Sequence, residues 1–218
     1  MKKFQLFIKR AFDIVVSFLM IVVLIAIPVL IIVPILVKLS SKGPAVFVQE
    51  RMGKGQKVFN IYKFRTMRLP PEGTYSVDGK LYKPNGELLE PSSTRITKIG
   101  AVLRKTSLDE LMQLFNILNG TMSFVGPRPT LPYQVENYTE EQKRRFEVRP
   151  GVTGLAQVSG RNGLTWTEKI QYDIEYVDNF SLWMDIKILF KTVAVVFKKE
   201  DIAFVKEDSI TSKEANDK

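Results

Sequence analysis

The sequence predicts a mostly helical α+β protein whose N-terminal part is a helical hairpin inserted into a membrane. Three observations support this fold class. A run of 24 residues without a charged side chain, Ile14–Val37, is interrupted by proline. Two short β-like pieces separated by glycines come next, and apolar residues after position 96 recur mainly at helical spacing. We expect amphipathic helices and one minor β-hairpin to form the remaining body.

The composition limits the chemistry that the chain can perform. It has 218 residues and a net charge of +9, which suits one domain with an appendage and an anionic partner such as nucleic acid, an acidic membrane surface or a phosphorylated molecule. Histidine and cysteine are both missing, which excludes a Ser-His-Asp triad, a thiolate nucleophile and a His- or Cys-ligated zinc. Any metal would be a hard cation on oxygen ligands, and Mg²⁺ is the one expected.

The apolar run is long enough for a membrane helix, which needs roughly 20 such residues. Pro28 and Pro34 interrupt it, and a proline inside a helix removes a backbone hydrogen bond and produces a kink. The basic residues on its two flanks are Lys2, Lys3, Lys9 and Arg10 before the run and Lys38, Lys42, Arg51, Lys54 and Lys57 after it. Because positive flanks favour the cytoplasmic side, a kinked hairpin that enters and leaves by one leaflet is preferred over a tilted single span.

The segments after the membrane run alternate between short strands, loops and helices. The pieces "AVFVQ" and "KVFNIYKF" predict a β-hairpin within residues 41–67, and residues 70–93 predict an exposed polar loop with two turn signals. Helical spacing covers residues 96–118 with a break at Thr106-Ser107, and residues 166–199 with a break near Asn179. We therefore divide the chain into a membrane anchor (1–40), a cytosolic domain (41–200) and a polar tail (201–218).

Two adjacent carboxylates, Asp109 and Glu110, allow two interpretations. Ser107 followed three positions later by Glu110 fits a capping box at a helix start, with Asp109 favouring the helix dipole. A helix start also binds phosphate, and a carboxylate placed there meets a phosphoryl group if Mg²⁺ and arginines relieve the charge repulsion. Arg104 and Arg128 are candidates for that second role, which is phosphate chemistry with a carboxylate nucleophile.

The chain resembles the bacterial sugar transferases, the monotopic phosphoglycosyl transferases that begin glycan assembly on polyprenol phosphate. The resemblance runs from Lys9 to about Lys198. The motifs that carry it are "KRAFD", "GPAVFVQERMG", "YKFRTM", "LRKTSLDELMQLFNILNGTMSFVGPRP", "RPGVTGLAQVSGRN" and "YVDNFSLWMDIKIL". In length it is similar to the small catalytic form of the family.

The resemblance implies transfer of a phosphosugar from a UDP-sugar to undecaprenyl phosphate, with release of UMP, through a covalent aspartyl intermediate and with Mg²⁺. It makes Asp109 the nucleophile and Glu110 the second carboxylate, both near the metal, and it places the re-entrant break at Pro28. The substrate-binding residues that the matching motifs imply are Lys63, Arg104, Arg128, Arg149 and Arg161. A role for Arg149 as an ordinary ion-pair partner of Glu147 or Asp173 is the alternative.

The implied location is the cytoplasmic face of a bacterial inner membrane, with no nucleic acid partner. The sugar stays open, and so does the oligomeric state, for which a dimer is one option. The sequence departs from the family at Ile27 before the proline break, at Met112 and at Thr121, where Ser, Pro and Asp are usual. The alternative function is a non-catalytic, membrane-anchored binder or scaffold for acidic lipids or glycan-assembly enzymes.

Overall fold

A computed structural model describes residues 2–77, 80–89, 92–160 and 163–197 of the chain. The predicted polar tail lies outside these residues. In chain order the elements are α1 (Lys2–Ala26), α2 (Val29–Ser40), β1 (Val46–Met52), η1 (Lys54–Gln56), β2 (Val58–Phe64), β3 (Tyr75–Val77), β4 (Lys80–Tyr82), η2 (Ser92–Arg95), α3 (Lys98–Lys105), η3 (Leu108–Met112), α4 (Gln113–Asn119), β5 (Ser123–Val125), α5 (Pro132–Val135), α6 (Glu140–Lys143), η4 (Arg144–Glu147), β6 (Gly151–Thr153), α7 (Leu155–Ser159), α8 (Trp166–Asp178) and α9 (Leu182–Phe197).

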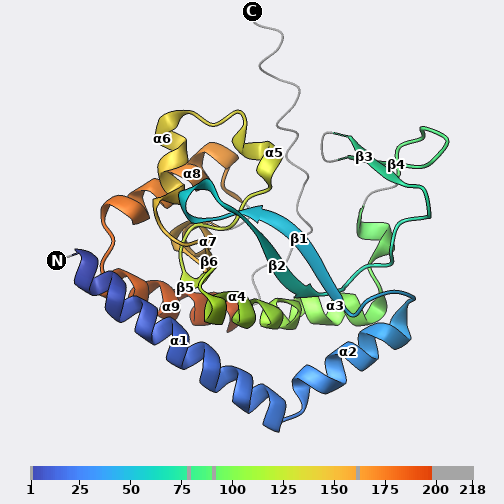
Figure 1. Ribbon diagram of the computed structural model, residues 1–218, viewed down its shortest axis with the longest axis horizontal. Helices are drawn as coiled ribbons and strands as arrows, with labels where there is room; N and C mark the ends of the chain where they lie inside the picture. The colour runs from blue at the N-terminus through green and yellow to red at the C-terminus, as the bar shows by residue number, and fades with distance from the viewer. Residues whose placement is uncertain (1, 78–79, 90–91, 161–162, 198–218) are drawn as a thin grey trace, which may run out of the picture.

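Helices dominate the architecture, which confirms the predicted mostly helical α+β class. Helices α1 and α2 form a V along one side of the molecule, and the remaining elements lie above it (Figure 1). Over the described residues the strands form only two-stranded sheets: β1 with β2, β3 with β4, and the parallel pair β5 and β6. The parallel pair was not predicted, because each of its strands has only three residues.

The N-terminal helices bend sharply at the predicted break. Helix α1 ends at Ala26, α2 begins at Val29, and the two axes differ by 66°. In the described part of the chain no helix alone meets the length and hydropathy of a membrane span, whereas α1 and α2 meet it together as a bent pair. Pro28 lies in this break. Pro34, where a kink was also predicted, lies inside α2, which continues to Ser40, so the helix does not end there.

Helix α1 is fixed to the body of the protein by its polar side chains. The Lys9 ammonium donates to the Val125 carbonyl at 2.9 Å and forms an ion pair with Asp185 at 2.6 Å. The Arg10 guanidinium donates to the Ile117 carbonyl, at the end of α4, at 2.6 Å. Apolar side chains of the V, by contrast, remain exposed, among them Phe7, Phe18, Ile27, Ile31 and Leu39. The helix pair therefore contacts the body through these polar side chains and through buried apolar ones such as Ile21 and Val37, and it presents a further apolar face outward.

The hairpin of β1 and β2 confirms the predicted one and sets the orientation of a basic face. Its antiparallel register pairs Phe47 with Lys63 and Arg51 with Phe59. Side chains directly opposite each other share a face of the sheet, and that face alternates along each strand. Arg51 and Lys63 consequently lie on the same face as Ile61, which is buried against α1 and α4.

Helix α4 is aligned with β2 by one buried amide. The Asn116 side chain accepts from the Tyr62 backbone N–H at 3.0 Å and donates to the Asn60 carbonyl at 2.7 Å. It is fully buried, so it satisfies two edge groups of the strand that would otherwise be orphaned. Since η3 leads directly into α4, this contact also fixes where η3 lies relative to Lys63.

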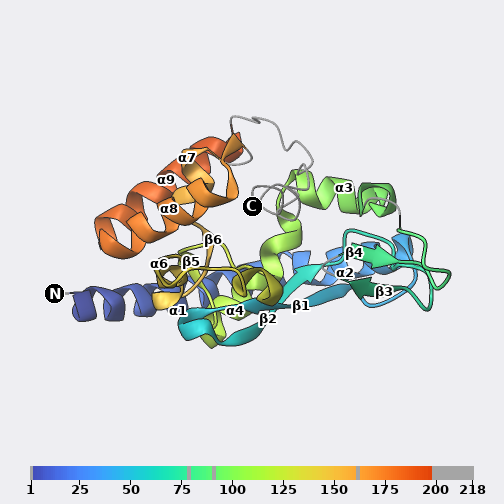
Figure 2. The ribbon, with the colours of Figure 1, turned by 90° about the horizontal axis from the view of Figure 1, so that it is seen from above.

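Helices α8 and α9 form the second half of the body. Both match the predicted amphipathic segments, and the break between them falls at 179–181, as expected. Seen from above, they lie beside the strands and away from β3 and β4 (Figure 2). Trp183 and Phe190 on α9 are largely exposed, at 62% and 73%. The polar segment 70–93, predicted as a loop, also carries the short hairpin β3–β4.

Candidate active site

The carboxylate pair lies on a tight turn that is not capped by serine. Ser107 has a left-handed backbone (φ 56°) and makes no side-chain cap hydrogen bond. The residues that follow, Leu108–Met112, form a 3-10 helix, in which the Glu110 N–H donates to the Ser107 carbonyl at 3.2 Å. The capping-box interpretation is therefore wrong, because the Glu110 side chain is turned toward cations and not back to the backbone of Ser107.

Glu110 is held by two cations from different parts of the chain. Its Oε1 atom lies 2.7 Å from the Lys63 ammonium on β2 and 3.5 Å from the Arg128 guanidinium in the loop after β5. Burial by itself would raise the pKa of Glu110, but Arg128 and Lys63 outweigh it and hold that pKa below the ordinary value. Glu110 is thus an ionised, immobilised carboxylate at neutral pH.

Asp109 has the opposite character. Burial raises the pKa of its carboxyl group, and the nearby charge of Glu110 raises it further. The charges of Lys63 and Arg104 lower that pKa, but the net shift is upward. No other residue in the described ranges donates a hydrogen bond to its carboxylate or forms an ion pair with it. The adjacent carboxylates therefore differ. Glu110 is held by cations, whereas Asp109, within that part of the chain, accepts only from its own backbone N–H and is more basic, which suits a nucleophile.

Arg104 approaches the pair from the last turn of α3. Its Nε atom donates to the Thr66 hydroxyl at 2.9 Å, and its Nη2 lies 3.1 Å from the Met67 sulfur. Both partners are uncharged, so the positive charge of Arg104 is not neutralised by them. The structure brings Lys63, Arg104 and Arg128 to the carboxylate pair, in agreement with the three sequence predictions.

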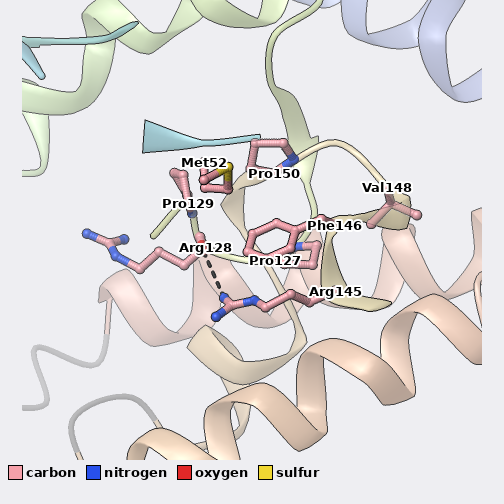
Figure 3. Close-up of a pocket in the computed structure, with 8 residues that line it drawn as sticks. All are labelled: Met52, Pro127, Arg128, Pro129, Arg145, Phe146, Val148 and Pro150. Carbon is pink, nitrogen blue, oxygen red and sulfur yellow. Dashed lines mark hydrogen bonds between the residues drawn. The ribbon is translucent and has the colours of Figure 1, made fainter. Parts of the chain in front are cut away.

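The loop that presents Arg128 is anchored by a residue that the sequence analysis missed. Arg145, only 3% exposed, donates to the Arg128 carbonyl at 2.9 Å, while the Arg128 guanidinium points away from it (Figure 3). Arg145 also forms a buried ion pair with Asp173 at 2.6 Å. The aromatic rings within cation-π distance of Arg145 are Tyr138, Phe146 and Trp166. No local sequence signal marked Arg145, because its partners are distant in sequence.

The other predicted residues lie elsewhere. Arg149 donates to the Gly120 carbonyl at 2.8 Å, past the end of α4 and away from the carboxylate pair. The alternative that Arg149 pairs with Glu147 or Asp173 is wrong, because those acids pair with Arg144 and Arg145. Arg161 is outside the described residues. Pro28 lies in the break between the N-terminal helices.

The carboxylate oxygens of Asp109 and Glu110 could bind a divalent cation, but they do not surround one. In the described residues no group of three or more acidic side chains gathers at one point. Mg²⁺ commonly binds through one or two carboxylates and completes its shell with water and substrate phosphates. Asp109, to whose carboxylate no cationic side chain of the described residues is bound, and the second oxygen of Glu110 fit such an open site.

Comparisons with known proteins find similarity to bacterial sugar transferases. A family model described as bacterial sugar transferase matches residues 4–199. The uncharacterized sugar transferase EpsL of Bacillus subtilis is 43% identical over 186 residues, which is 85% of each chain. The undecaprenyl-phosphate galactose phosphotransferase of Salmonella typhimurium is 39% identical over 88% of this chain and 40% of its own. A UDP-glucose:undecaprenyl-phosphate glucose-1-phosphate transferase of Escherichia coli is 40% identical over 85% of this chain and 39% of its own. This chain thus spans about two fifths of the length of each of the last two relatives.

Proposed function

Because the chain belongs to the bacterial sugar transferase family, we propose that it transfers a phosphosugar from a UDP-sugar to undecaprenyl phosphate and releases UMP. The observation that carries this proposal is the asymmetric pair of Asp109 and Glu110 among the cations Lys63, Arg104 and Arg128. A basic carboxylate without an ion-pair partner among the residues described, inside a positively charged site, suits attack on a phosphate. The relatives' names include galactose, glucose and N-acetylgalactosamine donors, so the sugar is left open.

In the first half-reaction a carboxylate oxygen of Asp109 attacks the β-phosphorus of the UDP-sugar. The bond from that phosphorus to the bridging oxygen breaks, and UMP leaves with the electron pair. The phosphosugar remains on Asp109 as a mixed anhydride. Two anions must approach each other in this step, so Arg104 and Arg128 lower the repulsion and are already in place before the substrate binds.

In the second half-reaction a phosphate oxygen of undecaprenyl phosphate attacks the same phosphorus. The bond to Asp109 breaks, the carboxylate is restored, and the product is a lipid diphosphate sugar. Lys63 keeps Glu110 ionised and fixed throughout, since the pair is linked at 2.7 Å. Asp109 and Glu110 are the residues that would hold Mg²⁺, which when bound would supply charge neutralisation for the phosphates.

The bent pair α1–α2 is the proposed membrane anchor. Its outward apolar side chains suit the acyl region, while Lys9 and Arg10 stay bound to the body of the protein. A hairpin that enters and leaves by the cytoplasmic leaflet of the inner membrane would hold the site next to a lipid acceptor. Proximity then replaces a three-dimensional search for that substrate.

The proposal is tested by incubating the full chain in nanodiscs with Mg²⁺, undecaprenyl phosphate and a panel of UDP-sugars. The expected result is stoichiometric release of UMP and formation of a lipid diphosphate sugar with at least one donor. Release of UDP would mean that the sugar–oxygen bond is cleaved and would contradict the mechanism. Absence of turnover with every donor, in protein shown to be folded, would favour a binding or scaffold role.

A further inference from the structure

Arg51 is a further basic residue on the hairpin that carries Lys63. It lies on β1, on the same face of the hairpin as Lys63. The next residue, Met52, donates its backbone N–H to the Thr130 carbonyl at 2.8 Å, so the end of β1 is bound to the loop that carries Arg128. Two separate segments therefore bring the guanidinium groups of Arg51 and Arg128 near each other.

The charge of Arg51 has no acidic partner in the described part of the chain. Its guanidinium donates a hydrogen bond to the neutral Gln49 amide oxygen, at 2.7 Å. Burial is the main cause that lowers the pKa of Arg51 to about 10, and the nearby charge of Arg128 also lowers it. Tyr133 has a smaller effect in the opposite direction. Two neighbouring cations, one of them partly buried and unpaired with an acid, form a place where an anion is favourable.

The order of the charges along the site indicates which anion fits. Lys63 and Arg128 contact Glu110 directly, at 2.7 and 3.5 Å. Thr130, two residues after Arg128 in the same loop, accepts from the backbone N–H of Met52, the neighbour of Arg51. The loop therefore leads from the carboxylate pair at Arg128 toward Arg51, so the site suits an anion with two adjacent phosphates.

We propose that Arg51 binds the α-phosphate of the UDP-sugar, the phosphate that departs on UMP, while Arg128 binds the β-phosphate that stays with the sugar. This inference rests on the proposed function and assigns the donor's orientation within it. The planar guanidinium fork suits the paired oxygens of a phosphate, and its fixed charge stabilises the negative charge that develops on the leaving group.

The test measures UMP affinity by calorimetry on the full chain in nanodiscs, for wild type, Arg51→Gln and the control Lys54→Gln. Lys54 is an exposed cation in the turn of the same hairpin, so its replacement removes the same charge elsewhere. We expect Arg51→Gln to weaken UMP binding about tenfold or more, the loss typical of a charge-assisted hydrogen bond. The Lys54→Gln variant should bind UMP within about twofold of wild type.

A second measurement separates the two phosphates. After the phosphosugar adduct has been formed with excess donor and the donor removed, its discharge by undecaprenyl phosphate should proceed within about twofold of the wild-type rate in Arg51→Gln, because the α-phosphate has left. A discharge that slows as much as adduct formation would overturn the assignment, as would unchanged UMP affinity.

If Arg51→Gln does not fold, Arg51→Lys replaces it in the test. Lysine keeps the positive charge but lacks the two parallel N–H donors of the guanidinium. We expect this variant to lose about threefold or more in UMP affinity, and wild-type affinity in Arg51→Lys would then contradict the assignment. If the wild-type protein itself binds neither UMP nor UDP, the proposed function fails. If it binds both and the Arg51 variants bind them equally well, only this inference fails.

Discussion

Replacing Arg145 by methionine tests whether the Arg128 loop depends on a buried charge. Both members of the Arg145–Asp173 pair are almost inaccessible, with side chains 3% and 2% exposed, and their charged groups are 2.6 Å apart. The substitution removes the cation and leaves the carboxylate of Asp173 buried without its partner. It also removes the hydrogen bond that Arg145 donates to the Arg128 carbonyl.

The expected loss of stability is large. Breaking a buried ion pair by removing one partner costs about 3–5 kcal/mol. In a protein of this size each kcal/mol lowers Tm by roughly 2–4 °C, so the variant should melt about 6–20 °C below wild type. The matched control is Arg144→Met, because Arg144 pairs with Glu141 and Asp178 at the surface, where ion pairs contribute about 0–1 kcal/mol.

The pH dependence gives a second, independent test of the same variant. Burial raises the pKa of Asp173 to about 6 even with Arg145 present, and loss of the arginine raises it further. A carboxyl group with a raised pKa in the folded state binds its proton more tightly there than in the unfolded chain, so stability falls as pH rises through that range. Arg145→Met should therefore be less destabilised at pH 5 than at pH 8.

The assay is thermal unfolding of detergent-solubilised protein at both pH values, with Arg145→Met/Asp173→Asn as the rescue variant. The double variant should recover part of the lost Tm, because it no longer buries an unpaired charge. Equal Tm losses in Arg145→Met and Arg144→Met would refute the reasoning. So would a loss at pH 5 as large as that at pH 8.

Four further predictions follow from the described contacts. Ser107→Ala should lower the free energy of unfolding by less than about 0.5 kcal/mol, and Thr97→Ala by about 1 kcal/mol, because of these two residues Thr97 alone caps a helix with its side chain. Equal losses in urea titrations would contradict this. Lys63→Met should slow the burst of UMP released in the first turnover about 100-fold, as measured by rapid-quench kinetics, and Lys63→Arg should slow it less. Because Lys63 lowers the pKa of Asp109, and Asp109 attacks only when ionised, the acidic limb of that burst should shift to higher pH in Lys63→Met, and an unmoved limb would argue against Asp109. Pro28→Leu should straighten the helix pair toward a span, so that a single cysteine placed before α1 becomes labelled from the periplasmic side; unchanged labelling would count against the hairpin.

Elements with long periodic patterns were predictable from the sequence. The alternation of "AVFVQ" and "KVFNIYKF" gave β1 and β2, and helical spacing gave α8 and α9 with their break. Proline chemistry marked both Pro28 and Pro34, and the family resemblance assigned the break to Pro28. The helix pair bends there, whereas α2 continues through Pro34. The local pattern around Ser107 predicted a cap, but tertiary pairing of Glu110 with Lys63 prevailed over it.

The site was predictable only in part, and the reason is distance along the chain. Lys63, Arg104 and Arg128 were found through motifs and all reach the carboxylate pair. Arg145 was missed because it acts through a hydrogen bond to the backbone of Arg128, a contact that depends on packing and that no short motif records.

The central claim is that Asp109 carries the phosphosugar, and intact-mass analysis tests it most directly. The full chain is mixed with Mg²⁺ and a donor UDP-sugar without lipid acceptor, and fragmentation then locates any added mass. We predict one phosphosugar on Asp109, lost when undecaprenyl phosphate is added and never formed in Asp109→Asn. An adduct on another residue, or wild-type turnover by Asp109→Asn, would contradict the account.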